Sequence, residues 1–89
     1  MDIRKEVIIK NKTGLHARPA AVFVQIANKY DSDITIIKED QEVNGKSIMG
    51  VMMLAAACGS EITFYLDGDD AEESLAGLRA LIERKFDED

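Results

Sequence analysis

The chain has 89 residues, of which 46% are hydrophobic and 31% are charged, and its formal net charge is −6 at pH 7. This length suits a single domain over residues 1–89, and the hydrophobic share is too high for a disordered chain. Nucleic-acid binding draws on clustered lysine and arginine, so the net negative charge argues against a nucleic-acid partner.

Apolar residues alternate, or recur at helical spacing, along the whole chain and divide it into short elements. In "IRKEVIIK" (3–10), apolar Ile3 and Val7 alternate with charged Arg4 and Glu6, as in a half-exposed strand. The expected elements are, in chain order, a strand over residues 3–10, a helix over 17–30, a strand over 34–38, a short strand within 39–45, a helix over 47–57, a strand over 61–66 and a helix over 71–86. The order β-α-β-β-α-β-α predicts an α+β domain whose helices pack their apolar stripes on one face of a sheet.

Polar residues and a proline mark where the helices begin. Pro19 fits the first turn of the first helix, where a missing N–H has no intrahelical partner to lose. Ser47 is the expected N-cap of the second helix. Asp70 and Glu73 form a capping-box pattern at the start of the last helix, and the tail "FDED" (86–89) after it is expected to be solvated and frayed. The apolar stripe of that last helix is Leu75, Leu78 and Ile82.

Membrane and disulfide signals are absent from the sequence. The longest run without a charged residue, 47–60, is shorter than the ~20 residues that a bilayer-spanning helix needs. The start "MDIRKEV" has no apolar segment of the kind a signal peptide contains. The one cysteine, Cys58, cannot form an internal disulfide and is expected to be a small, half-buried residue. We therefore expect a cytoplasmic protein that does not insert into a membrane.

The stretch "TGLHARPA" (13–20) holds the only histidine of the chain, His16, at the threshold of a helix. The residues leave several roles for it: a core histidine, a metal ligand, a phosphoryl acceptor or a structural N-cap. A core histidine needs a buried partner, whereas a loop and a helix start are usually exposed. A metal site needs companions, and Cys58 alone cannot complete one, so neither a metal nor a cofactor is expected.

A phosphoryl group suits this position chemically. The unpaired N–H groups of the first turn and the positive end of the macrodipole attract an anion. Neutral imidazole is a nucleophile, because one of its ring nitrogens carries no proton. Arg18, two residues further on, can donate charge-assisted hydrogen bonds to phosphoryl oxygens. Phosphoryl acceptance and a structural N-cap role therefore both remain open for His16.

The motifs "GLHARPA" (14–20) and "GKSIMGVMMLAA" (45–56) together resemble the histidine-containing phosphocarrier (HPr) family of the bacterial phosphoenolpyruvate:sugar phosphotransferase system. The resemblance extends over essentially the whole chain. It implies the open-faced β-sandwich of that family, a four-stranded antiparallel sheet covered on one face by three helices. It also implies a carrier, not an enzyme, that takes a phosphoryl group from enzyme I and passes it to the enzyme IIA domains of sugar permeases.

The resemblance also implies roles for single residues. By position, His16 would accept the phosphoryl group through Nδ1. Arg18 would stabilise the phosphate with its guanidinium, and the backbone amides of Ala17 and Arg18 would face it. Ser47 would be the serine that HPr kinase/phosphorylase phosphorylates in many members. This role can coexist with N-capping, because a phosphate at an N-cap lies favourably against the helix dipole.

The second motif also predicts a docking surface. Its helix is short and cannot bury every side, and methionine side chains repack easily against different partners. We expect either Met53 or Leu54 in the core. The remaining apolar residues are expected to edge an exposed patch beside His16 that docks enzyme I, enzyme IIA and the kinase; they are Ile48, Met49 and Met52.

Two alternative functions remain open. One is a nitrogen-related phosphotransferase carrier, which would perform the same chemistry with a signalling output. The other is a regulatory binding module that, once phosphorylated at Ser47, partners a transcriptional regulator. In either case we expect a monomer.

Overall fold

The strands and helices follow one another in the order expected from the sequence. The computed structural model describes residues 1–87 of the chain. Its elements are β1 (Asp2–Ile8), α1 (Ala17–Ala27), β2 (Asp33–Lys38), β3 (Gln41–Asn44), α2 (Ile48–Met53), β4 (Glu61–Asp67), α3 (Ala71–Glu83) and the 3₁₀ turn η1 (Lys85–Asp87).

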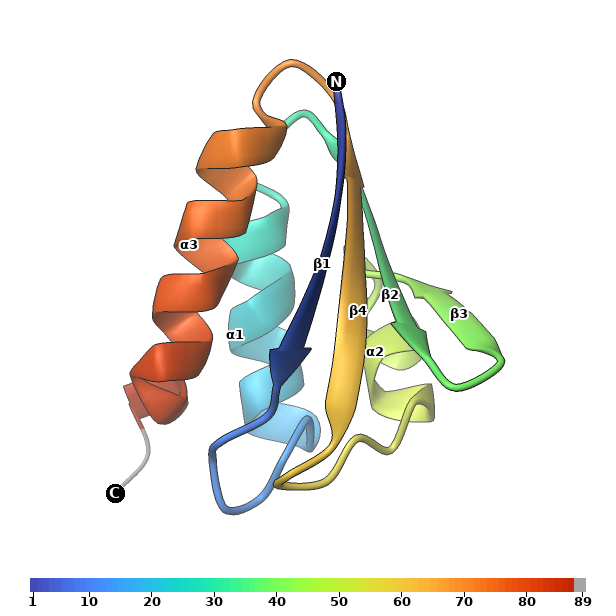
Figure 1. Ribbon diagram of the computed structural model, residues 1–89. Coiled ribbons are helices and arrows are strands. Elements are labelled where there is room, and N and C mark those ends of the chain that lie inside the picture. The colour runs from blue at the N-terminus through green and yellow to red at the C-terminus, as the bar shows by residue number, and fades with distance from the viewer. Residues whose placement is uncertain (88–89) are drawn as a thin grey trace.

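The strands form one antiparallel sheet in the order β1-β4-β2-β3. Strand β4 pairs on both sides, so that Leu66 stands opposite Ile3 of β1 and Ile34 of β2. The helices lie on one face, with α1 and α3 side by side and α2 packed against α1 and β3 (Figure 1). The expected fold, a four-stranded antiparallel sheet with three helices on one face, is therefore confirmed.

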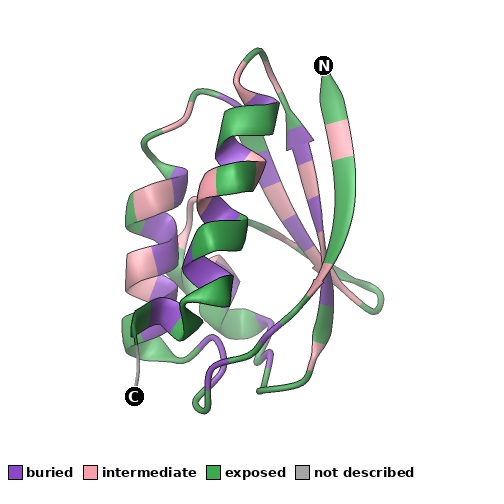
Figure 2. Ribbon diagram, turned by 60° about the vertical axis from the view of Figure 1, so that its left-hand side comes forward, coloured by how far each residue is buried: buried purple, intermediate pink, exposed green. Residues whose placement is uncertain are grey.

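The core lies between the sheet and the helices. The ring of Phe23 on α1 and the ring of Phe64 on β4 have centroids 5.7 Å apart and planes tilted by 42°. This tilted arrangement is favourable for two aromatic rings. In Figure 2 the buried positions of α1 and α3 form a stripe along each helix. Of the stripe predicted for α3, Leu78 and Ile82 are buried and Leu75 is half-buried.

All three helices end earlier than the sequence suggested, and α3 stops at Glu83 instead of residue 86. Helix α1 stops at Ala27, where the side-chain amide of Asn28 turns back and donates to the carbonyl of Val24 at 2.9 Å. Helix α2 stops at Met53 instead of residue 57. Its end follows from Ala55, which has a positive φ of 49° and so cannot continue a right-handed helix.

The capping box expected at the start of α3 is wrong. Asp70 occupies the N-cap position but makes no side-chain bond to its own helix. Its carboxylate instead accepts hydrogen bonds from the backbone amides of Asp31, at 2.8 Å, and Ser32, at 2.9 Å, and from the Ser32 hydroxyl. Asp70 thus ties the turn before α3 to the turn before β2.

The end of the described chain also differs from expectation. Phe86 was expected in a solvated, frayed tail, but only 7% of it is exposed and it joins the core cluster. The rest of that expectation falls partly on residues 88–89, which lie outside the described residues. Within residues 1–87, no helix combines the length and apolarity that a membrane crossing requires.

Candidate functional site

His16 stands at the N-cap of α1 with its side chain exposed. Its backbone is extended, with φ −83° and ψ −171°, and its carbonyl accepts the first helical bond from the amide of Ala20 at 2.8 Å. The imidazole makes no capping hydrogen bond to the helix. His16 therefore occupies the N-cap position, but its side chain does not cap the helix and is exposed to solvent.

The first turn of α1 offers hydrogen-bond donors without acceptors. The amides of Ala17 and Arg18 are the first two of the helix and have no carbonyl one turn earlier to bind. No acidic residue stands in this turn to neutralise the positive end of the helix dipole. The Arg18 side chain is exposed, and the ion pairs among residues 1–87 do not include it. An anion bonded to His16 would thus find two amides and one guanidinium close in sequence.

The segment that follows α2 packs against the residues before His16. The amide of Leu15 donates to the carbonyl of Ala56 at 2.8 Å. Gly14 lies so close that an added Cβ would come within 2.2 Å of the same carbonyl oxygen. Together these segments surround a shallow depression beside His16; it is lined by Thr13, Leu15, His16, Met52, Ala55, Ala56 and Ala57. The sequence did not predict this contact between its two motifs.

Ser47 begins α2 as expected. Its side-chain oxygen accepts a hydrogen bond from the amide of Gly50 at 3.1 Å, and its own amide donates to the carbonyl of Asn44 at 3.1 Å. The side chain is half-buried. The prediction of an N-cap at Ser47 is confirmed.

Helix α2 turns one face to the core and leaves the other in solvent. Val51 and Leu54, three residues apart, are buried. Leu54 is thus the core residue, and Met53, the other candidate, is exposed instead. The exposed apolar residues, which we call the α2 patch, are Ile48 (45% exposed), Met49 (75%), Met52 (40%) and Met53 (65%). The sequence predicted three of these residues, Ile48, Met49 and Met52. It did not settle whether Met53 faces the core or the solvent, because that depends on the rotation of α2 that buries Val51.

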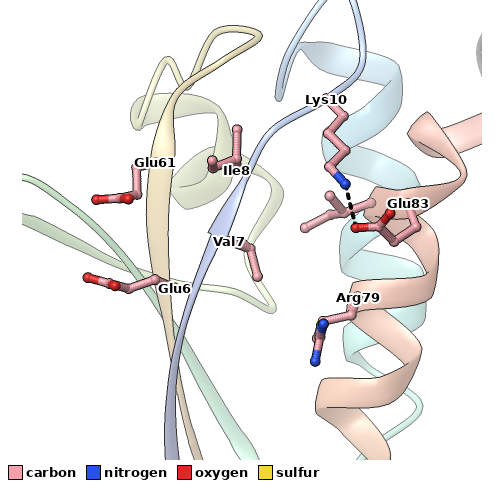
Figure 3. A pocket seen from close by; sticks show the side chains of 8 residues that line it. Glu6, Val7, Ile8, Lys10, Glu61, Arg79 and Glu83 are labelled. Atoms are coloured by element: carbon pink, nitrogen blue, oxygen red, sulfur yellow. Dashed lines mark hydrogen bonds and ion pairs between the residues drawn. The ribbon is translucent and has the colours of Figure 1, made fainter.

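A second hollow lies between β1 and α3 (Figure 3). At its rim the ammonium of Lys10 binds the Glu83 carboxylate at 2.7 Å, and this hydrogen bond lowers the pKa of Glu83. None of the residues expected to serve the site lines this hollow. Cys58 is exposed, and its thiol lies 3.7 Å from the carbonyl oxygen of Lys10. The expectation of a half-buried cysteine is therefore wrong.

The chain is similar to a known family along nearly its whole length. A family model described as the PTS HPr component phosphorylation site matches residues 3–84. The phosphocarrier protein HPr of Treponema pallidum is 45% identical over 96% of this chain and 97% of its own length. The HPr-like protein Crh of Halalkalibacterium halodurans is 51% identical over 93% of this chain and 99% of its own.

Solved structures agree with these relatives. The crystal structure of "HPr-C-His" from Thermoanaerobacter tengcongensis has a TM-score of 0.94 and 49% identity, and the match covers 98% of both chains. A structure described as an HPr dimer from the same organism has a TM-score of 0.79 and 52% identity, covering 92% of this chain and 94% of its own.

Proposed function

The chain belongs to the HPr family of phosphocarrier proteins, and from this premise we propose that it accepts a phosphoryl group on His16 from enzyme I and donates it to enzyme IIA domains for sugar uptake. As a member of this family it carries the group and is not an enzyme in its own right. The match over residues 3–84 supports one phosphocarrier domain over residues 1–89. Because enzyme I and enzyme IIA domains are the proposed partners, we also propose that the protein acts in the cytoplasm.

The observation that carries the proposal is the exposed imidazole at the open end of α1. In the transfer, a ring nitrogen of His16, Nδ1 in the family, attacks phosphorus. The bond from phosphorus to the donor breaks, and the donor keeps the electron pair. The amides of Ala17 and Arg18 and the Arg18 guanidinium can then bind the phosphoryl oxygens. Transfer of this kind depends on positioning and charge stabilisation more than on acid–base groups of the carrier.

The α2 patch is the proposed docking surface for these partners. Met52 lines the depression beside His16, so the patch and the acceptor are continuous on one side of the molecule. An exposed apolar surface next to a reacting group can seat both donors and acceptors, and methionine adapts to each. Docking would therefore bring the reacting phosphorus to the imidazole.

Regulation at Ser47 is a second proposal on the same surface. Ser47 borders Ile48 of the patch, and a phosphate on its oxygen adds charge to the docking surface without requiring the helix to refold. HPr kinase/phosphorylase is the proposed kinase, and a transcriptional regulator is the proposed binding partner of the phosphorylated form. A structure 46% identical to this chain is described as Crh, the Bacillus subtilis catabolite repression HPr, and this supports a regulatory module as the alternative function. The nitrogen-related carrier stays as a second alternative on the sequence motifs alone.

The assembly state also stays a proposal. A monomer was expected, but a relative 52% identical to this chain is described as a dimer. Light scattering behind size-exclusion chromatography at several protein concentrations distinguishes the two states. A mass that stays at one chain supports the monomer, and a mass that rises to two chains contradicts it.

The proposed function is tested by incubating the protein with its cognate enzyme I and phosphoenolpyruvate, followed by intact-mass analysis. We expect an acid-labile gain of one phosphoryl group that His16→Ala abolishes. A second incubation with an enzyme IIA domain should remove the group again. Absence of phosphorylation by a functional cognate enzyme I would overturn the proposal.

A further inference from the structure

Side chains from the β2–β3 hairpin close the C-terminal end of α2. The last carbonyls of a helix have no amide one turn later to bind them. In α2 the carbonyl of Met53 accepts a hydrogen bond from Nε2 of Gln41 at 3.4 Å. The carbonyl of Leu54 accepts one from the ammonium of Lys38 at 3.3 Å. Lys38 and Gln41 stand opposite each other where β2 ends and β3 begins. One hairpin position thus supplies both donors.

Lys38 is the stronger of these two donors. Its charge lies at the negative end of the α2 dipole, where a cation is favoured. Its side chain is half-buried, and the ion pairs among residues 1–87 do not include it. A lysine without a carboxylate partner that reaches a helix carbonyl has a positional role, unlike a lysine that only adds charge to the surface.

The chain beyond this closed helix end leads directly to His16. After Leu54, Ala55 adopts a left-handed backbone, with φ 49°, which a residue with a side chain holds only when its surroundings enforce it. The next carbonyl, that of Ala56, accepts the hydrogen bond from Leu15 at 2.8 Å. Leu15 is bonded to His16. One residue, Ala55, therefore separates the Leu54 carbonyl that Lys38 contacts from the Ala56 carbonyl that holds the acceptor loop.

We propose that Lys38 is a positioning residue for phosphoryl transfer. It fixes the Leu54 carbonyl, and through the segment 55–57 it sets the place of Ala56 and hence of the loop that presents His16. The same contact fixes the end of α2 that carries Met52 and Met53. The proposal rests on the proposed phosphocarrier function, although its structural part does not depend on any partner.

The test compares two variants. Lys38→Met removes the positive charge and the hydrogen-bond donor, and Lys38→Arg keeps both. The first readout is amide hydrogen exchange in the unphosphorylated protein. We expect Lys38→Met to speed exchange at the Leu15 amide by about ten-fold, because its acceptor on Ala56 becomes mobile. Exchange at the amide of Phe64, in the central strand, should stay unchanged. A general loss of stability would instead speed both amides.

The second readout is transfer from phosphorylated enzyme I. Lys38→Met should raise the KM for the carrier by about ten-fold or lower kcat/KM to the same extent, and Lys38→Arg should recover most of the loss. Lys29→Met is the matched control, since it removes an exposed lysine beyond the opposite end of α1. Gln41→Ala, which frees only the Met53 carbonyl, should have a smaller effect.

The two readouts separate this proposal from the proposed function. If wild-type protein is not phosphorylated, the function fails, while the exchange result still decides whether Lys38 holds the loop. If Lys38→Met exchanges its Leu15 amide at the wild-type rate, or if it behaves like Lys29→Met in the transfer assay, the positioning role is overturned.

Discussion

The backbone amide of Leu15 donates to the carbonyl of Ala56 over 2.8 Å, and this bond joins the two motifs of the chain. One motif carries the candidate acceptor, His16, and the other carries the α2 patch. The bond makes their relative position a property of the backbone, so a change that disturbs it should affect the acceptor and the docking surface together.

Gly14→Ala should disturb this contact most directly. Gly14 has φ +66°, and an added Cβ would lie 2.2 Å from the Ala56 oxygen and 2.8 Å from the Cα of Ala57. Both neighbours are backbone atoms that cannot turn away. We expect a loss of about 3 kcal/mol in the free energy of unfolding, from left-handed strain and overpacking together, measured by urea denaturation.

Gly59→Ala is the matched control for Gly14→Ala. Gly59 also has a positive φ, +91°, but nothing lies within 4 Å of an added Cβ. Its cost should be limited to backbone strain, about 1 kcal/mol, and transfer should remain near the wild-type rate. Equal losses in the two variants would mean that the contact with Ala56 contributes nothing.

Arg18→Ala should slow phosphoryl transfer without lowering stability. The guanidinium is exposed and is not part of the ion pairs among residues 1–87, so its removal leaves no folded contact unpaired. Its loss should reduce kcat/KM from enzyme I by roughly 10- to 100-fold, if it stabilises the transferring phosphoryl group. Rapid quench measurements check the rate and thermal melting checks the Tm. A variant with the wild-type rate would remove Arg18 from the site.

Ser47→Ala should cost about 1 kcal/mol, because the amide of Gly50 loses its capping acceptor. For a domain of this size, the Tm should fall by roughly 4–8 °C. Ser47→Asp retains a capping oxygen and adds negative charge, so it should melt close to wild type while binding enzyme I more weakly. If both variants bind enzyme I as wild type does, charge at Ser47 does not control docking.

Much of the architecture could be predicted because it is encoded locally. Strand alternation, the N-cap at Ser47 and the placement of His16 before a helix each depend on a few neighbouring residues. The strand order could not be read, since β4 pairs with β1 and β2 over long stretches of chain. The bond from Leu15 to Ala56 is of the same kind, because it joins two segments that are far apart in the chain.

Some predictions from local sequence patterns were wrong because tertiary contacts determine which of two similar residues or arrangements occurs. Asp70 fits a capping box by sequence, but the amides of Asp31 and Ser32 reach its carboxylate first. Met53 and Leu54 are equally apolar, and the rotation of α2 that buries Val51 selects Leu54. Helical periodicity alone does not set that rotation.

Met49→Asp should weaken partner docking and leave the fold intact. Met49 is 75% exposed, so a charge there meets no core. If the α2 patch docks enzyme I, the new carboxylate must lose its water on docking. The KM of enzyme I for the carrier should then rise about ten-fold or more, while the Tm stays unchanged. Ala76→Asp places the same carboxylate at an exposed position of α3, outside the α2 patch, and serves as the control. Equal KM values for the two variants would place docking elsewhere.

Asp70 predicts a stability difference that depends on pH in a defined direction. The hydrogen bond from the Ser32 hydroxyl, with those from the backbone amides of Asp31 and Ser32, lowers the pKa of Asp70 below its ordinary value of 3.8. A carboxyl whose pKa is lower in the folded state contributes its stability above the unfolded pKa and loses it as the pH falls through the folded one. Asp70→Asn should therefore lower the Tm at neutral pH.

The difference in Tm between wild type and Asp70→Asn should stay constant from neutral pH down to about pH 5 and shrink as the pH falls below 3.8, the ordinary value for this group. Asp69→Asn, at an exposed aspartate one residue earlier, is the control and should show little difference at any pH. A difference for Asp70→Asn that persists undiminished at the acid end would contradict the assigned cause. The contribution of Asp70 would then be one of shape and packing in the turn, because protonation would have removed any part that depends on its charge.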